Sequence, residues 1–159
     1  MIEEIKSILK EKFGENIEFE EKGKEFMIIV DKDFLFECLK LLREHPFLFF
    51  DFLTDITAID HYPQDKRFEI VYHLYSFKFS RRIRVKSKLE EPEIKSCVSI
   101  WKSASWPERE IYEMFGIHFF DHPNLKSLLL WDKFEGFPLR KDFQIDSEIR
   151  SPDFKDLEE

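Results

Sequence analysis

Acidic and basic side chains gather in the segment Ser105–Gly116, whose sequence is SWPEREIYEMFG. Three carboxylates, Glu108, Glu110 and Glu113, surround the guanidinium of Arg109. Paired carboxylates on one helix could act as a general acid and a general base. The sequence offers no nucleophile or partner base beside them. We therefore favour a second interpretation, in which the segment is a capped helix whose charges bridge to a neighbouring chain.

Local signals in this segment support a helix. Ser105 is a candidate N-cap, with Glu108 three residues later as its capping-box partner. Pro107 falls in the first turn, where its missing N–H costs nothing. Gly116 follows the last apolar residue and is expected to end the helix in a left-handed conformation.

Two histidines, His118 and His122, have the spacing of an inverted metalloprotease motif. Gly116 precedes them and Pro123 follows, so a helix between them is disfavoured. In extended chain the two residues would lie about 13 Å apart at roughly 3.3 Å per residue, too far to share one metal ion. We therefore expect no metal site. A stand-alone metal-dependent hydrolase that uses these histidines and the acidic helix is kept as an alternative.

The composition excludes the common redox cofactor sites. The chain has 159 residues, with four glycines that are nowhere closer than nine residues apart, which rules out a dinucleotide-binding turn or a P-loop. Its two cysteines, Cys38 and Cys97, are too few for an iron–sulfur cluster or a Cys-rich zinc site. We expect both thiols to be reduced and packed as small hydrophobes. We therefore expect no cofactor on this chain.

Nucleic acid and membrane binding are also disfavoured. Basic residues occupy every second position from 82 to 88, so four basic side chains share one face of a strand. The net charge of the chain is −8, and no RNA-binding motif accompanies this row. A solvated face, or one docked on an acidic partner, explains it better than nucleic acid. No run approaches the roughly 20 apolar residues of a membrane span, and the N-terminus shows no secretory signal.

The pattern of the chain indicates an α+β protein, with N-terminal helices packed on a mainly antiparallel sheet and followed by an extended C-terminal arm. We expect residues 1–95 to form the α+β domain, and residues 96–159 to hold the signature helix and an interaction arm. The expected helices cover residues 2–13, 33–45, 97–101 and 105–115. The expected strands cover residues 17–21, 25–30, 50–60, 68–76 and 79–88.

The arm is rich in aromatic residues and shows little periodicity. Seven of the 19 phenylalanines lie from Phe115 onward. Long loops of this kind are usually functional, and laying the arm on another protein would bury its rings. We therefore expect several of these seven rings to be exposed when the chain is viewed alone.

Three blocks of sequence resemble one protein family. They are Trp101–Ile117, His122–Leu129 and Glu135–Phe143, with the signatures ERE, HPN and PLRKD. Together they are similar to the C subunit of respiratory complex I, the proton-translocating NADH:quinone oxidoreductase. Relatives of that protein occur in photosynthetic complex I and in membrane-bound energy-converting hydrogenases. The resemblance is dense over residues 98–143 and extends more loosely back to about Leu53.

The resemblance implies a cofactor-free subunit of the hydrophilic arm, with no catalytic, cofactor or metal residue of its own. It would pack on the hydrogenase-large-subunit-like subunit that helps form the quinone site, and on other hydrophilic-arm subunits. NADH, flavin, iron–sulfur clusters and quinone would belong to partners, and membrane association would be indirect, on the cytoplasmic side. An equivalent subunit of a membrane-bound energy-converting NiFe hydrogenase is the alternative. The implied interface residues are Glu108, Arg109, Glu110, Glu113, His122, Lys126, Arg140, Lys141 and Asp142.

Overall fold

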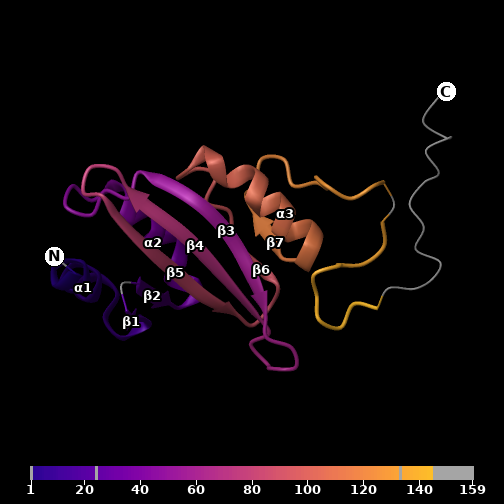
Figure 1. Ribbon diagram of the computed structural model, residues 1–159, viewed down its shortest axis with the longest axis horizontal. Coiled ribbons are helices and arrows are strands. Elements are labelled where there is room, and N and C mark those ends of the chain that lie inside the picture. The colour runs from indigo at the N-terminus through magenta and orange to yellow at the C-terminus, as the bar shows by residue number, and fades with distance from the viewer. Residues whose placement is uncertain (1, 24, 133, 145–159) are drawn as a thin grey trace.

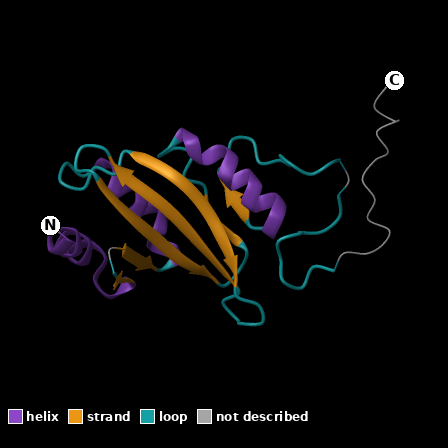
Figure 2. Cartoon of the chain, viewed as in Figure 1, coloured by secondary structure: helices purple, strands orange, loops and turns teal. Residues whose placement is uncertain are grey.

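The computed structural model describes residues 2–23, 25–132 and 134–144. Helix α1 and the short strands that follow it lie at one end of the molecule, and α3 lies at the other end (Figure 1). Loops form most of the chain that follows the last strand (Figure 2). In the described part of the chain, no helix is long and apolar enough to cross a membrane.

The first half of the chain is a helix, a hairpin and a second helix. The elements are α1 (Ile2–Phe13), a 3₁₀ turn (Gly14–Asn16), β1 (Ile17–Lys22), β2 (Glu25–Val30) and α2 (Lys32–Glu44). Gly14 has a φ of +58°, a left-handed conformation that glycine adopts without strain, and it ends α1 as expected. Helix α2 is as expected but begins one residue earlier, at Lys32, with Asp31 at the N-cap position.

The remaining elements are three long strands followed by shorter elements. They are β3 (Phe52–Asp60), β4 (Phe68–Ser76), β5 (Arg81–Leu89), β6 (Glu93–Lys95), a 3₁₀ turn (Lys102–Ala104), α3 (Ser105–Phe115) and β7 (His118–Phe120). The expectation of a helix at residues 97–101 is wrong. The N–H groups of Ile100 and Trp101 both donate to the Cys97 carbonyl, which closes a single turn.

The predicted α+β class is confirmed by the five-stranded sheet, whose order is β1-β2-β5-β4-β3. Its pairs are antiparallel except β2 with β5, which are parallel. A second, two-stranded sheet pairs β6 with β7 in parallel. The parallel pairs escaped prediction because their partners are far apart in sequence, with helices or strands between them.

One face of the large sheet carries the hydrophobic core. The register places Ile28, Val85, Tyr72 and Ile56 in one row across four strands, and all four are buried. Buried side chains from all three helices join this same core. The four alternating cations at residues 82, 84, 86 and 88 of β5 occupy the opposite face, as their alternation predicts, and Arg84 there forms a bidentate ion pair with Glu25.

The core is continuous across residue 95. Ile94 of β6, Trp101, Ile111 of α3 and Phe119 of β7 belong to the same buried cluster as the sheet. Helix α3 therefore completes the folded domain. The expected boundary between residues 95 and 96 stays a prediction about which part of the chain meets a partner. Residues 145–159 of the expected arm lie outside the described residues.

Both cysteines are free and buried, as expected of packed thiols. Burial raises the pKa of the Cys38 thiol to about 12 and that of Cys97 well above its usual range. Only the thiolate reacts readily, so both should be inert in the native protein. We predict that a maleimide labels Cys38 and Cys97 only as fast as the protein unfolds, measured by mass spectrometry against urea concentration. Rapid labelling in native buffer would contradict this packing.

Candidate subunit interface at helix α3 and the C-terminal segment

Helix α3 ends as its sequence predicts but begins differently. Gly116 has a φ of +71°, and its N–H donates to the Tyr112 carbonyl at 2.9 Å. The capping box is absent, because the 3₁₀ turn runs directly into α3 and leaves Ser105 in helical conformation. The side chain of Glu108 therefore does not bind the N-terminus of α3 and points into the protein instead.

Glu108 is a buried anchor between α3 and the chain that follows β6. Its side chain accepts hydrogen bonds from the Ser96 hydroxyl at 2.6 Å and from the Cys97 N–H at 2.7 Å. Burial raises the pKa of Glu108, while these two bonds act in the opposite direction. The residue is fully buried, so it is inaccessible to a substrate and serves to position Cys97 and α3.

Arg109 and Glu113 hold the backbone of the C-terminal segment, which we define as residues 121–144. The Arg109 guanidinium donates to the carbonyls of Lys126 at 2.9 Å and Ser127 at 2.7 Å. One helical turn later, the Glu113 carboxylate accepts the N–H groups of residues 129 and 130 at 2.8 and 3.0 Å. Opposite charges on one face of α3 therefore satisfy both kinds of backbone group in the segment.

His122 fixes the start of the segment. Its Nε2 lies 3.1 Å from the Ser105 carbonyl and its Nδ1 accepts the Asn124 N–H at 3.0 Å, so the proton is assigned to Nε2. His118 lies on β7, with its ring edge-on to the rings of Tyr112 and Phe120. Among the described residues, no group of three or more His, Cys, Asp or Glu is placed to hold a metal ion.

A network of charges ties the end of the segment to the β3–β4 turn. Arg67 donates two hydrogen bonds to the buried Asp60, at 2.8 and 2.7 Å, and also binds both carboxylate oxygens of Asp142. Asp60 further accepts the N–H of Lys141 at 2.8 Å. The Arg67 guanidinium holds the pKa of Asp60 well below its usual range, helped by the backbone donors. Asp60 is therefore a carboxylate at any ordinary pH.

Arg140 closes the C-terminus of α3. Its Nε donates to the Phe115 carbonyl at 2.6 Å, and its guanidinium lies 4.3 Å from the centroid of the Phe137 ring. The N–H of Leu139 donates to the Met114 carbonyl at 3.1 Å. These are carbonyls that the last turn of a helix leaves without a partner, so the segment acts as an extended C-cap.

The structure thus brings all nine predicted residues into one region around α3. The side chains of six of them bind other parts of the same chain: Glu108, Arg109, Glu113, His122, Arg140 and Asp142. The side chains of the remaining three, Glu110, Lys126 and Lys141, are exposed. Their role at a subunit interface stays a prediction. Sequence analysis missed Asp60 and Arg67, because nothing in the β3–β4 turn announces a contact more than 70 residues away.

The expectation that several C-terminal phenylalanines are exposed is wrong for the described residues. Phe115 and Phe119 are buried, Phe134, Phe137 and Phe143 are half-buried, and Phe120 alone is exposed. The segment uses most of its rings to pack on its own domain. Phe154 lies outside the described residues.

Other apolar side chains are exposed in this region. Trp106 on α3 is 68% exposed, and Leu129 and Leu139 of the segment are 61% and 52% exposed. These side chains offer apolar area in the same region as the three exposed charges.

With this geometry in place, comparison with known proteins identifies the family. Residues 28–148 match the family described as respiratory-chain NADH dehydrogenase, 30 Kd subunit. The chain belongs to this family. The matched range contains every described residue of α3 and the C-terminal segment.

Relatives extend over most of the chain. The C subunit of the NADH-quinone oxidoreductase of Citrifermentans bemidjiense is 45% identical over 147 residues, which cover 91% of this chain and 90% of the relative. A C subunit of the NADH-quinone oxidoreductase of Rhizobium meliloti is 46% identical over 121 residues, 76% of this chain and 66% of the relative. NADH dehydrogenase (ubiquinone) iron-sulfur protein 3 of Beta trigyna is 40% identical over 148 residues, 91% of this chain and 76% of the relative.

Two solved structures share the fold. A trypsin-resistant fragment of Nqo5 superimposes with a TM-score of 0.64 at 27% identity, covering 76% of this chain and 98% of the fragment. A chain of the membrane-bound sulfane sulfur reductase, an archaeal respiratory membrane complex, gives a TM-score of 0.74 at 25% identity. It covers 90% of this chain and 85% of that chain.

Two substitutions of Glu108 separate its hydrogen bonds from its charge. We predict that Glu108→Gln keeps both bonds, because the amide oxygen can accept from Cys97 N–H and the amide nitrogen can donate to Ser96. Glu108→Ala leaves buried polar groups unpaired and should lower the free energy of unfolding by about 2–4 kcal/mol. Urea denaturation at pH 7 checks both values.

The glutamine variant gives a pH dependence with a definite sign. Because the folded-state pKa of Glu108 is raised, its contribution to stability is fully present below the unfolded pKa. That contribution to stability is lost as the pH rises through the pKa of Glu108 in the folded state. The stability of Glu108→Gln relative to wild type should therefore increase between pH 4 and pH 8. A constant difference over this range would contradict the raised pKa.

Gly116 allows a matched test of the segment's attachment. A Cβ at Gly116 would meet Arg140 Nη2 at 2.5 Å and the Phe137 ring at 2.6 Å, whereas a Cβ at Gly14 meets nothing within 4 Å. Both positions have positive φ, so both alanine variants carry backbone strain of about 1–2 kcal/mol. We predict that Gly116→Ala loses about 1 kcal/mol more than Gly14→Ala. Trypsin should also cleave the C-terminal segment faster in Gly116→Ala alone, and equal cleavage rates would refute the contact.

Proposed function

We propose that this chain is a cofactor-free subunit of the hydrophilic arm of an NADH:quinone oxidoreductase that couples electron transfer to proton translocation. The observation that carries the proposal is the 45% identity to the C subunit of such an enzyme over nine tenths of both chains. Its contribution to the complex is to assemble and position other subunits.

We assign the redox groups to partner subunits. Cys38 lies on α2 and Cys97 follows β6, and both are buried in the core with raised pKa values. Cluster ligands are thiolates, and a cluster takes four of them. The relative from Beta trigyna carries "iron-sulfur" in its name, and for this chain we attribute the clusters to the complex rather than to the subunit.

We assign the docking surface to α3 and the C-terminal segment, facing the hydrogenase-large-subunit-like subunit at the quinone site. The region combines exposed apolar side chains, Trp106, Leu129 and Leu139, with the exposed charges of Glu110 and Lys126. Apolar anchors with a charged rim are the usual composition of a protein interface. The intrachain bonds of Arg109, Glu113 and Arg140 hold this surface in shape before the partner arrives.

Membrane association would be indirect, through the complex, on the cytoplasmic side.

The structural similarity to a sulfane sulfur reductase complex favours one further candidate, an equivalent subunit of a related respiratory membrane complex or energy-converting hydrogenase. The electron donor and acceptor belong to other subunits, so this chain fits either assembly. A tag on this chain and purification of the native complex from its source would separate them. We expect NADH-driven quinone reduction in the purified complex, and hydrogen evolution or sulfane sulfur reduction without it would favour the second candidate.

Charge reversal at an exposed lysine tests the docking surface. Lys126→Glu leaves the folded chain intact, because Arg109 binds the Lys126 carbonyl and not its side chain. We predict an unchanged urea midpoint but about tenfold less assembled complex, because the inverted charge would repel the groups that Lys126 faces on the partner. Lys40→Glu, at an exposed position on α2, is the matched control and should assemble normally. Equal yields from the two variants would remove Lys126 from the interface.

The arginines that hold the segment should also matter for assembly. Arg109→Ala and Arg140→Ala release the backbone of the C-terminal segment, so the surface is no longer preformed. We expect lower complex yield in both, together with faster trypsin cleavage of the segment in the isolated subunit. Normal yield and quinone reductase activity would show that the preformed segment is not needed.

A further inference from the structure

Strand β1 is an open edge of the five-stranded sheet, at the opposite end of the molecule from α3 (Figure 1). The other edge, β3, packs against α3. Among the described residues, β1 pairs only with β2. An edge strand presents unpaired N–H and C=O groups that can template another strand.

The register identifies which backbone groups are available. The Asp31 N–H donates to the Asn16 carbonyl, directly opposite in the β1–β2 pairing. Antiparallel pairs alternate, so residues 18 and 20 exchange bonds with β2 while Ile17, Phe19 and Glu21 direct theirs away from it. Ile17 is 3% exposed, so the accessible outward groups are those of Phe19 and Glu21. In the described part of the chain, no other segment binds these outward groups.

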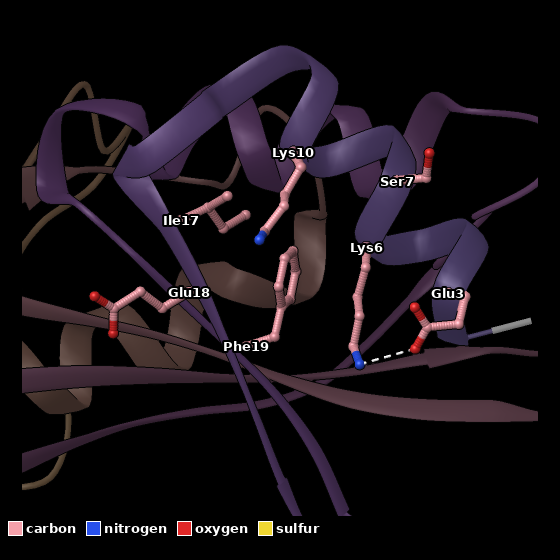
Figure 3. A pocket seen from close by; sticks show the side chains of 7 residues that line it. All are labelled: Glu3, Lys6, Ser7, Lys10, Ile17, Glu18 and Phe19. Carbon is pink, nitrogen blue, oxygen red and sulfur yellow. Dashed lines mark hydrogen bonds and ion pairs between the residues drawn. The ribbon is translucent and has the colours of Figure 1, made fainter.

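A groove of about 640 Å³ runs beside this edge, between α1 and β1. Figure 3 shows Lys6 and Lys10 reaching from α1 toward the strand, with Ile17 and Phe19 forming the apolar part of the groove. Lys6 binds Glu21 at 2.6 Å. The groove therefore has space for the side chains of one added strand, on the face of β1 that looks toward α1.

The other face of β1 is acidic. Glu18 and Glu20 lie opposite Ile29 and Met27, on the side of the sheet away from the core. A second copy of β1 in antiparallel pairing would place these carboxylates against one another, which is unfavourable. A basic residue opposite each carboxylate would be favourable, and the sheet already contains such a cross-strand pair between Glu25 on β2 and Arg84 on β5.

We propose that the β1 edge binds an extended segment of another protein in which basic residues alternate with small apolar residues. The segment adds antiparallel to β1 through the backbone groups of Phe19 and Glu21. Its basic side chains lie beside Glu18 and Glu20, and its apolar side chains enter the groove beneath α1. This inference does not depend on the proposed function, because the edge is remote from α3 and the C-terminal segment.

The test uses the full chain and a designed peptide, acetyl-TKVKVKT-amide, titrated into ¹⁵N-labelled protein. We expect amide shifts and slowed hydrogen exchange at Phe19 and Glu21. The charge-swapped peptide TEVEVET should bind at least about fivefold more weakly, since two favourable cross-strand pairs become unfavourable. Perturbation centred outside β1 would overturn the assignment.

N-methylation gives a matched pair of controls for strand pairing. The valines of the bound peptide stand opposite the outward residues of β1, so their N–H groups point at the edge. N-methylation of both valines should abolish binding, whereas N-methylation of two of the lysines should leave it nearly unchanged. Equal affinity of the two methylated peptides would overturn strand addition.

Charge reversal in the protein tests the specificity. Glu18→Lys combined with Glu20→Lys should invert the preference, so that TEVEVET binds more tightly than TKVKVKT. Glu37→Lys combined with Glu135→Lys makes the same change in net charge at exposed positions elsewhere and should keep the original preference. A preference that follows net charge in both variants, or dimerisation through β1 on sedimentation, would refute the proposed partner.

Discussion

The hydrogen bonds between charged side chains of α3 and the backbone of residues 126–130 determine much of this structure. A chain of irregular conformation that lies on a protein surface needs partners for its N–H and C=O groups. Here Arg109 supplies donors and Glu113 supplies acceptors, one helical turn apart. Because both act on backbone, they hold the segment in place without secondary structure, and Arg140 and Asp142 then complete the attachment at its end.

The anchoring of α3 itself is a separate constraint, set by Glu108. A fully buried carboxyl group is tolerated only when it is hydrogen-bonded, and Ser96 and Cys97 provide those bonds. Proximity of Cys97 and Glu108 also contributes to the raised pKa of the Tyr72 hydroxyl, although burial is the main cause. The polar cluster lies where β6, α3 and strand β4 meet, so it fixes the relative positions of elements that the sequence separates widely.

Sequence analysis located most elements, because alternation along β5 and the helical stripes of α1 and α2 are local properties. It found the residues of the candidate interface through the ERE and PLRKD blocks. It could not show that Arg109 and Glu113 bind the chain's own backbone, because backbone carbonyls and amides have no signature in sequence. It assigned Glu108 to a capping box for a similar reason, since burial of that side chain depends on a 3₁₀ turn placed just before it. The aromatic rings of the segment were expected to need a partner, but they pack on their own domain.

The attachment of residues 126–130 through backbone atoms leaves their side chains free to vary. Arg109 and Glu113 recognise carbonyl and amide groups that every residue except proline supplies in full, so substitutions at these positions do not release the segment. The outward surface of the segment can therefore change in charge and shape while the fold persists. Homologous subunits can therefore differ in these side chains to fit different neighbouring subunits. Such sequence changes stay within one short stretch and need no matching substitutions in the core.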